Sequence, residues 1–334
     1  MMSAANVVIP GSDMIGLEYL YNSTGGDAWL WRGPLNHWNF SSTNNPCLPS
    51  EWQGITCNCT NQVATDYCTI TGVNLYNYNL RGDIPPQLMM VSNLTSLNLG
   101  VNFLRGTLPS NINQLEKLVE YSLDGNGLVG TISTVICDLK MLVSLNLQQN
   151  FITGPLPSCI YLLNTTLEYA DFSKNFINGT IPNEYGAMTN LGTLDIGGNY
   201  LLGGNLPTAL CQLTNMYYFA ADENVLSGTI PSCFGSLQNL THLGLQINKL
   251  TGNIPTSIFE ISLLQELYTD VNKLNGTIPN LVYQLAHLKT FALNDNKFTG
   301  TIPEVWPDTI GRLWLHRNKL SGVIPSSIGV ASVL

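Results

Sequence analysis

A phrase that repeats about every 24 residues constrains the fold of this chain more than any other feature. Residues 97–109 read Leu-Asn-Leu-Gly-Val-Asn-Phe-Leu-Arg-Gly-Thr-Leu-Pro, and the same pattern recurs almost to the end. The equivalent asparagine stands at positions 102, 126, 150, 175, 199, 224, 248, 272, 296 and 318. An earlier, atypical copy has Tyr78 in place of the asparagine. The spacing therefore predicts eleven stacked coils, from about residue 70 to the C-terminus.

The letters of the phrase have a physical explanation. The Leu-x-Leu alternation has the period of a β-strand, so its leucines face inward. Each buried leucine contributes about 2 kcal/mol, but only when the coils above and below cover it. The asparagine amide can bond backbone groups of its own and the neighbouring coil, and loss of one such rung would cost about 1–3 kcal/mol. We therefore expect an internal asparagine ladder, with Gly and Pro shaping the return path.

The pattern LxxLxLxxNxLxGxIPxxLxxLxx resembles the plant-type leucine-rich repeat of receptor-kinase ectodomains and polygalacturonase-inhibiting proteins, which also occurs in protist and algal surface proteins. The resemblance implies a right-handed α/β solenoid with a parallel concave β-sheet, a second short strand near the Gly-x-Ile-Pro segment and short convex helices or 3-10 turns. Residues 1–69 resemble the family's N-terminal cap, through residues 24–29 (Thr-Gly-Gly-Asp-Ala-Trp) and the run from Cys47 to Cys57. The first phrase is more similar to microbial-eukaryote members. We therefore expect a cap over 1–69 and a solenoid over 70–334, without a recognisable C-terminal cap.

Composition excludes several classes of partner. The formal charge is −9, which disfavours nucleic acid and anionic membranes. No apolar run reaches the roughly 18 residues of a membrane helix, so no membrane insertion is expected. Residues 1–10 lack the features of a signal peptide, and we expect that a targeting segment has been removed.

The eight cysteines predict four disulfides. By resemblance to the family cap, Cys47 pairs with Cys57, which leaves Cys59 for Cys68. Two further pairs, Cys137 with Cys159 and Cys211 with Cys233, are each 22 residues apart and occupy the same places in adjacent coils. Free thiols and a metal site are the alternatives, although no Cys/His cluster has zinc spacing. Disulfides favour an oxidising, extracellular location: secreted, at the cell surface or in the wall or matrix.

The positions of the glycosylation sequons say more than their number, because about six are expected by chance in a chain this rich in Asn, Ser and Thr. They stand at Asn22, Asn39, Asn58, Asn93, Asn164, Asn178, Asn239 and Asn275. Asn93 and Asn239 share one repeat position, and Asn178 and Asn275 share another. None lies on the predicted concave strands, so sugar is expected on the flanks.

No catalytic constellation is visible. The four histidines are scattered, and no nucleophile elbow, phosphate loop or metal-binding helix accompanies them. We therefore expect a protein that is not an enzyme and that holds no cofactor and no metal.

Outward positions of the concave strands carry the candidate binding residues, because packing does not constrain them. From the third coil onward they gather acids and tyrosines, with a tryptophan and basic residues at the C-terminal end. The predicted ligand site consists of Tyr169, Asp171, Asp195, Tyr217, Tyr218, Asp222, Glu223, Tyr268, Asp270 and Trp314. Such a face suits a basic protein segment, a calcium ion or a glycan, and the alternative is a solvated polar face. The leading hypothesis is an extracellular recognition module that binds a protein, peptide or glycan.

Two other functions remain open from the sequence. The first is a structural surface glycoprotein that self-associates into filaments, its uncapped last coil receiving the apolar stretch 5–9 of the next copy as an added strand. The second is ice binding by a threonine column, formed by Thr107, Thr131, Thr180, Thr229, Thr277 and Thr301. Pro155, Asn205 and Asn253 interrupt this column, which favours ordinary second-strand threonines.

Overall fold

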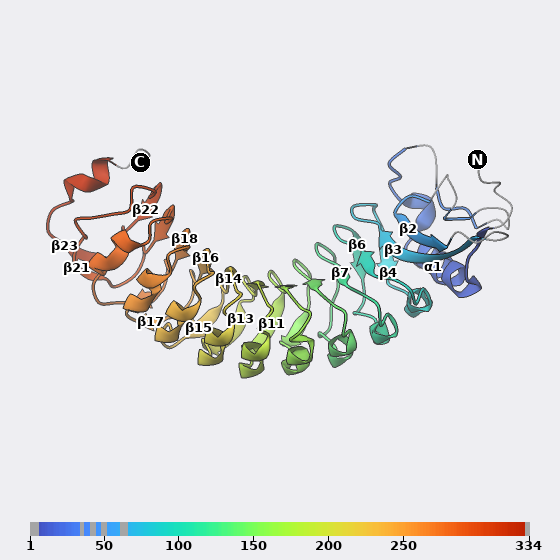
Figure 1. The fold of residues 1–334 in the computed structure, drawn as a ribbon, viewed down its shortest axis with the longest axis horizontal. Helices are drawn as coiled ribbons and strands as arrows, with labels where there is room; N and C mark the ends of the chain where they lie inside the picture. The colour runs from blue at the N-terminus through green and yellow to red at the C-terminus, as the bar shows by residue number, and fades with distance from the viewer. Residues whose placement is uncertain (1–6, 34–36, 41–44, 48–51, 61–65, 331–334) are drawn as a thin grey trace. The chain divides into compact units, whose positions relative to one another are not determined.

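The computed structural model describes residues 7–33, 37–40, 45–47, 52–60 and 66–330. The chain forms two compact units, residues 1–153 and 154–334. Within the described residues, each of the eleven predicted coils has one strand of the Leu-x-Leu segment, and the return path holds short 3-10 helices. In each unit the Leu-x-Leu strands and the 3-10 helices lie on opposite sides (Figure 1). The predicted solenoid architecture is thereby confirmed. No helix in this part of the chain is long and apolar enough to cross a membrane.

The first unit begins with the cap. The elements of the whole unit are β1 (Val7–Val8), α1 (Gly11–Ser23), η1 (Gly26–Ala28), β2 (Ile55–Thr60), β3 (Asp66–Asn74), β4 (Arg81–Asp83), η2 (Pro86–Met90), β5 (Ser96–Asn98), β6 (Phe103–Arg105), η3 (Ile112–Gln114), β7 (Glu120–Ser122), η4 (Thr134–Asp138) and β8 (Ser144–Asn146). Strands β3, β5, β7 and β8 form a parallel sheet in that order, β2 pairs antiparallel with β3, and β4 pairs with β6. β9 (Thr153–Pro155) spans the boundary to the second unit.

The second unit repeats one plan. Its main strands are β10 (Tyr169–Asp171), β12 (Thr193–Asp195), β14 (Tyr218–Ala220), β16 (His242–Gly244), β18 (Glu266–Tyr268), β20 (Thr290–Ala292) and β22 (Arg312–Trp314), which pair in parallel in this order. Its 3-10 helices are η5 (Ser158–Leu163), η6 (Asn183–Ala187), η7 (Thr208–Gln212), η8 (Ser232–Ser236), η9 (Thr256–Glu260), η10 (Asn280–Gln284) and η11 (Ser326–Val330). The second strands are β11 (Phe176–Thr180), β13 (Leu201–Asn205), β15 (Val225–Ser227), β17 (Thr251–Gly252), β19 (Lys273–Leu274), β21 (Thr299–Thr301) and β23 (Lys319–Ser321). They form a sheet of β15, β13, β11 and β9 in that order and the separate pairs β17–β19 and β21–β23. A single parallel bridge between Thr277 and Thr299 joins the last two pairs.

The predicted asparagine ladder is present. The Oδ1 of Asn126 accepts the N–H of Leu104 at 3.0 Å, and its Nδ2 donates to the carbonyls of Leu99 and Leu123, each at 3.0 Å. One of these bonds stays within the coil and two reach the preceding coil, and together they satisfy three buried backbone groups. The same set recurs around Asn199 and Asn296.

Each coil leaves the main strand through a left-handed residue just before the ladder asparagine. In the second unit this residue is Lys174, Gly198, Glu223, Ile247, Val271, Asp295 or Arg317, with φ between 49° and 66°. Left-handed backbone is costly for β-branched side chains, so Ile247 and Val271 are held there by the ladder bonds around them.

The cap ends the leucine core with aromatic residues. Trp29, Trp38 and Trp52 are buried, and the Trp38 and Trp52 rings stack at 5.6 Å. Tyr78, at the asparagine position of the first coil, lies against this cap, with the Arg32 guanidinium 5.1 Å from its ring centre. The first coil therefore packs against aromatic rings of the cap. An asparagine at position 78 would have no preceding coil to bond.

The predicted disulfides hold the cap and the coils. Cys47 is bonded to Cys57, Cys59 to Cys68 and Cys211 to Cys233. Cys137 and Cys159 are disulfide-bonded as well, and no cysteine in the described residues is free.

The N-terminal stretch forms the first strand of the sheet. Val7 and Val8 form β1, which pairs in parallel with Asp66 and Tyr67 of β3 in the same chain. Addition of this stretch to the last coil of another copy stays a prediction, because β1 is the terminal strand of the sheet and its outer edge pairs with no strand in the described residues. Residues 5 and 6 lie outside the described part of the chain.

Candidate functional site

The outward side chains of the second unit's main sheet form the candidate site, which we call the strand face. In each three-residue strand the middle residue, such as Ala170, Leu194 or Phe219, points into the core. The first and third residues point away from it. Because the strands pair with an offset of one repeat, equivalent residues line up in columns across the sheet. The strand face consists of these columns together with the residues that flank each strand.

The predicted site residues occupy these columns as expected. Two of them, Tyr169 and Tyr218, are the first residues of their strands, and four, Asp171, Asp195, Tyr268 and Trp314, are the last. The other four flank the strands: Tyr217 precedes β14, and Asp222, Glu223 and Asp270 follow β14 or β18. The strands β10, β12 and β14 bring together Tyr169, Asp171, Asp195, Tyr217 and Tyr218. Trp314 lies on β22, two strands beyond Tyr268.

Asp171 and Asp195 lie directly opposite each other on β10 and β12. Asp171 is buried, and its carboxylate accepts hydrogen bonds from the Tyr169 hydroxyl at 3.2 Å and from the Ser173 backbone N–H at 2.9 Å. Asp195 accepts one bond, from the backbone N–H of Gly197 at 2.9 Å. Burial, then the neighbouring charge of Asp171, raises the pKa of Asp195 to about 7.

A third carboxyl completes this cluster. A Cβ atom on Gly197 would lie 2.6 Å from Oδ1 of Asp222 and 3.2 Å from Oδ1 of Asp195, so the Asp222 carboxyl occupies the space that a side chain at 197 would need. Burial also raises the pKa of Asp222. We call Asp171, Asp195 and Asp222 the carboxyl cluster.

An aromatic cluster that the sequence did not reveal lies beside it. The Tyr218 and His242 rings stack with their centres 4.3 Å apart and their planes within 9°. The Nδ1 of His242 donates a hydrogen bond to Oε2 of Glu266 at 2.8 Å, and the Tyr268 ring lies 5.5 Å from the imidazole. The signal that could have revealed it is positional, since Tyr218, His242 and Glu266 follow one another in the same column at steps of 24 residues.

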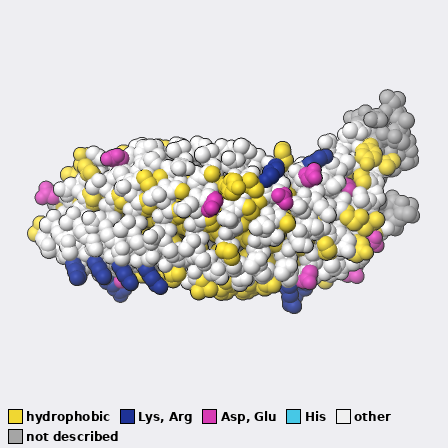
Figure 2. All heavy atoms as spheres, turned by 90° about the horizontal axis from the view of Figure 1, so that it is seen from below, with side chains coloured by type: hydrophobic (Ala, Val, Ile, Leu, Met, Phe, Trp, Pro, Cys, Tyr) yellow, Lys and Arg dark blue, Asp and Glu magenta, His cyan; other side chains and the backbone are white. Residues whose placement is uncertain are grey.

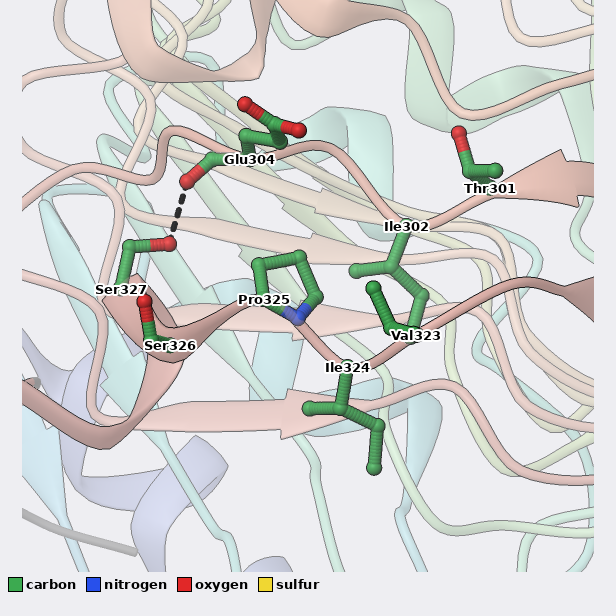
Figure 3. A pocket seen from close by; sticks show the side chains of 8 residues that line it. All are labelled: Thr301, Ile302, Glu304, Val323, Ile324, Pro325, Ser326 and Ser327. Atoms are coloured by element: carbon green, nitrogen blue, oxygen red, sulfur yellow. Dashed lines mark hydrogen bonds between the residues drawn. The ribbon is translucent and has the colours of Figure 1, made fainter.

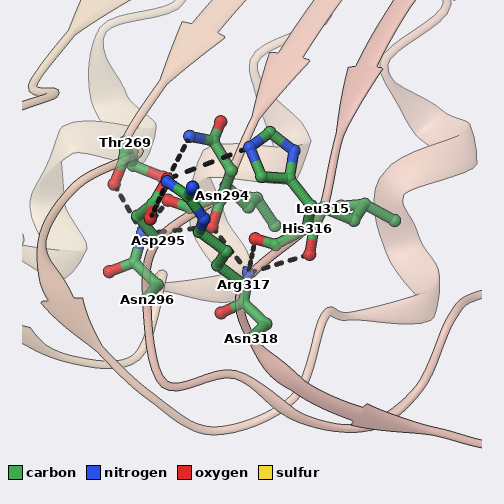
Figure 4. Close-up of polar contacts among 9 residues, drawn as sticks. Thr269, Asn294, Asp295, Asn296, Leu315, His316, Arg317 and Asn318 are labelled. Atoms are coloured by element: carbon green, nitrogen blue, oxygen red, sulfur yellow. Dashed lines mark hydrogen bonds and ion pairs between the residues drawn. The ribbon is translucent and has the colours of Figure 1, made fainter.

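Asp270 occupies the position of Asp222 two coils further on, with Gln246 between them, and burial raises its pKa. Beyond it the charges are paired (Figure 4): Oδ1 of Asp295 lies 3.2 Å from Nη1 of Arg317, and Asn294 donates to Oδ2 at 2.8 Å. The Asn294 bond, followed by Arg317, lowers the pKa of Asp295. The acidic part of the strand face therefore extends from Asp171 to Asp270.

Two tyrosines frame the carboxyl cluster. The half-exposed Tyr217 ring lies over Gly192, where a Cβ atom would be 2.5 Å from the ring. Tyr200, which the sequence did not single out, donates its hydroxyl hydrogen to Oε2 of Glu223 at 3.1 Å. These rings add rigid contact area to the acidic surface.

The other candidate sites can be placed as well. No group of three or more His, Cys, Asp or Glu side chains in the described residues has an arrangement that would hold a metal ion. The threonine column is exposed, but it runs along second strands that pair only in short pieces.

Seven of the sequon asparagines are exposed and Asn93 is half-buried, so their glycosylation stays a prediction.

A hollow of about 530 Å³ lies away from the strand face, near β21 and β23 (Figure 3). Val323 and Ile324 form its apolar wall, and the Ser327 hydroxyl donates to the Glu304 carbonyl at its edge. It brings none of the predicted site residues together.

Comparison with known proteins identifies the fold. No protein-family model matches the chain, and no curated protein matches it by sequence. Among solved structures, the ectodomain of the Arabidopsis thaliana receptor kinase GASSHO1/SCHENGEN3, in complex with CASPARIAN STRIP INTEGRITY FACTOR 2, superposes with a TM-score of 0.84 at 32% identity over 94% of this chain. The Arabidopsis receptor kinase HAESA, in complex with the peptide hormone IDA and the co-receptor SERK1, gives a TM-score of 0.76 at 26% identity over 95% of this chain.

The extent of these similarities differs. This chain spans 36% of the GASSHO1 chain and 55% of the HAESA chain. A plant ice-binding protein is similar over 95% of this chain and 97% of its own, with a TM-score of 0.78, but at 22% identity it shows the shared fold alone. The chain superposes on the receptor ectodomains over almost its whole length, and it has the repeated coils, the asparagine ladder and a disulfide-bonded N-terminal region, so it is a leucine-rich-repeat protein of the plant-type repeat class.

Proposed function

We propose that this protein is an extracellular, non-catalytic recognition module that binds a basic segment of a peptide or protein on the strand face of its second unit. The observation that carries the proposal is the carboxyl cluster beside the stacked Tyr218 and His242 rings. At neutral pH, Asp195 and Asp222 have few hydrogen-bond donors to stabilise their charge. A lysine or arginine side chain would supply that stabilisation, since charge-assisted bonds to carboxylates are stronger than neutral ones.

The aromatic cluster supports the same class of ligand. Tyrosine faces attract cations, and rigid rings lose little conformational entropy on binding. The Glu266 carboxylate holds the His242 ring against Tyr218, so this part of the surface is already ordered before a ligand arrives. The receptor ectodomains described above, one of them solved with a peptide hormone, support binding of a peptide by this fold.

The disulfides support the location. Cys47–Cys57, Cys59–Cys68 and Cys211–Cys233 are stable in an oxidising compartment, and such bonds are rare in the cytosol. We therefore place the module outside the cell.

The experiment compares two charge-matched variants. Twelve-residue fluorescent peptides with four Arg residues, and the same peptides with Gln instead, are titrated with the protein and followed by fluorescence anisotropy. The variant Asp195→Asn with Asp222→Asn is expected to bind the Arg peptides at least about tenfold more weakly, because two carboxylate partners are lost. The control, Glu184→Gln with Glu260→Gln, makes the same charge change on η6 and η9 and is expected to bind normally. Equal losses in both variants, or equal binding of Arg and Gln peptides, would contradict the proposal.

A further inference from the structure

A row of four lysines lies at the start of the second strands of the last coils or two residues before them, away from the strand face. They are Lys249, Lys273, Lys297 and Lys319, each directly after the ladder asparagine of its coil. All four are exposed, and none of their ammonium groups forms an ion pair with any residue in the described ranges. Figure 2, seen from the side of the 3-10 helices, shows a row of basic side chains along one edge of the surface.

The backbone fixes the direction and spacing of this row. Lys273 is the register partner of Thr251, and Lys319 is the partner of Thr299. Each lysine therefore lies on the strand next to that of the preceding lysine. Along the strand direction it is displaced from that lysine by two residues. With strands about 4.8 Å apart and about 3.3 Å per residue, neighbouring lysines are separated by about 8 Å along a slanted line. Four like charges at this spacing, in a protein of net charge −9, form a local surface of opposite sign.

Polar side chains fill the positions between the lysines. Thr251, Asn275, Thr299 and Ser321 each stand two residues after a lysine, on the same face of its strand, and all are exposed. The hydroxyls of Thr251 and Thr299 donate their hydrogens to the carbonyls of Gly228 and Gly276, at 3.1 and 3.2 Å. Their lone pairs therefore remain free to accept hydrogen bonds.

We infer that this row, which we call the lysine row, binds a linear anionic polysaccharide. The ammonium groups match carboxylates or sulfates that recur along the sugar chain, and the free lone pairs of the threonines match the sugar hydroxyls between them. A DNA strand or a polyglutamate segment carries its charges without hydroxyls between them. The row is separate from the proposed peptide site, so this inference does not depend on peptide binding at the strand face.

The test uses the full oxidised chain, made both in a host that adds no N-linked glycans and in one that adds them. Sugar on Asn275 would lie between Lys273 and Lys297, so the glycosylated chain is expected to bind more weakly than the unglycosylated one. Binding of alginate, dextran sulfate and neutral dextran is measured by affinity electrophoresis at low salt. Alginate and dextran sulfate distinguish carboxylate from sulfate ligands, and binding of either one supports the inference. Neutral dextran is expected not to bind.

Variants assign the binding to the row. Changing all four lysines to Gln is expected to weaken polysaccharide binding at least about tenfold and to flatten its salt dependence, whereas changing all four to Arg retains it. Lys273→Gln with Lys297→Gln is expected to weaken binding more than the charge-matched control, Lys117→Gln with Lys140→Gln, in the first unit. The strand-face variant Asp195→Asn with Asp222→Asn is expected to bind polysaccharide normally.

Several outcomes would overturn the inference. They are failure of both anionic polysaccharides to bind, unchanged binding by a quadruple Gln variant that is folded by circular dichroism, and equal losses in the two double Lys→Gln variants. Poly-L-glutamate and oligo-dT are included at equal charge concentration. Tighter binding of either one than of the polysaccharides would assign the row to an acidic protein segment or to nucleic acid instead.

Discussion

Asp171 and Asp195 face each other across two neighbouring parallel strands, yet their environments differ. Hydrogen bonds from Tyr169 and Ser173 hold the Asp171 carboxylate, whereas Asp195 has one backbone donor and a pKa raised to about 7. Within the pair, Asp171 is therefore ionised, and Asp195 releases its proton near neutral pH.

The first prediction concerns stability and pH. Because the folded-state pKa of Asp195 lies above its usual value of 3.8, the folded protein binds more protons between about pH 4 and pH 7, and the free energy of unfolding falls as the pH rises through that range. Asp195→Asn keeps an acceptor for Gly197 and is expected to be more stable than wild type at pH 7.5, by on the order of 1–2 kcal/mol, and equal to it at pH 4. Urea unfolding at both pH values measures this. A difference that does not change with pH would contradict it.

The second prediction rests on the proposed peptide site. Binding of an Arg peptide is expected to strengthen as the pH rises from 5.5 to 8, because Asp195 becomes charged near pH 7. In Asp195→Asn this part of the pH dependence is expected to disappear. Anisotropy titrations at four pH values test both statements, and an unaltered pH profile in the variant would rule out Asp195 as the group responsible.

The third prediction compares two rungs of the asparagine ladder. The Oδ1 of Asn199 accepts the N–H of Ile177, whereas the Oδ1 of Asn224 is buried without a partner, because the longer coil before it turns the Leu202 N–H to the carbonyl of residue 199. Asn199→Ala is expected to lower the free energy of unfolding by about 2–4 kcal/mol, and Asn224→Ala by about 1 kcal/mol less. Urea denaturation measures both. Equal losses would show that the Oδ1 bond contributes little.

The fourth prediction concerns the left-handed position. Val271 has a φ of 51°, a conformation that costs a β-branched residue free energy and that Asn adopts more readily. Val271→Asn is expected to raise the free energy of unfolding by about 1 kcal/mol. Val305→Asn, at an exposed valine without positive φ, is the matched control and is expected to give no gain. Thermal unfolding by circular dichroism compares the two variants. A similar gain in stability in both would show that replacing an exposed valine with a polar side chain, and not the positive φ, is the cause.

Much of the fold was predictable because its determinants are local and periodic. The asparagine spacing predicted the strand of every coil, and the 22-residue spacing of Cys211 and Cys233 predicted their disulfide. The pairing of β1 with β3 was not predictable, because a two-residue apolar segment satisfies many possible strand edges equally well. Nor does the sequence mark the left-handed positions, where Ile247 and Val271 stand instead of Gly or Asn.

The candidate site was predictable in outline and not in detail. Periodicity identified the columns that carry Asp195, Asp222 and Tyr218, since packing leaves those positions free. It could not show that His242 lies flat on the Tyr218 ring, because ring orientation depends on the Glu266 bond in the next strand. It also could not distinguish the buried Asp171 from its more accessible neighbour, since the Tyr169 and Ser173 bonds arise only in the folded coil.

The asparagine ladder has a mechanical consequence. Because each rung joins a coil only to its neighbours, stability is distributed along the stack and is not concentrated in one centre. A coil that loses its neighbour on one side keeps half of its contacts, so opening proceeds from an end or from a weak rung such as that of Asn224. Under brief proteolysis the chain would then shorten in increments of whole coils, and the fragments would differ in length by multiples of about 24 residues.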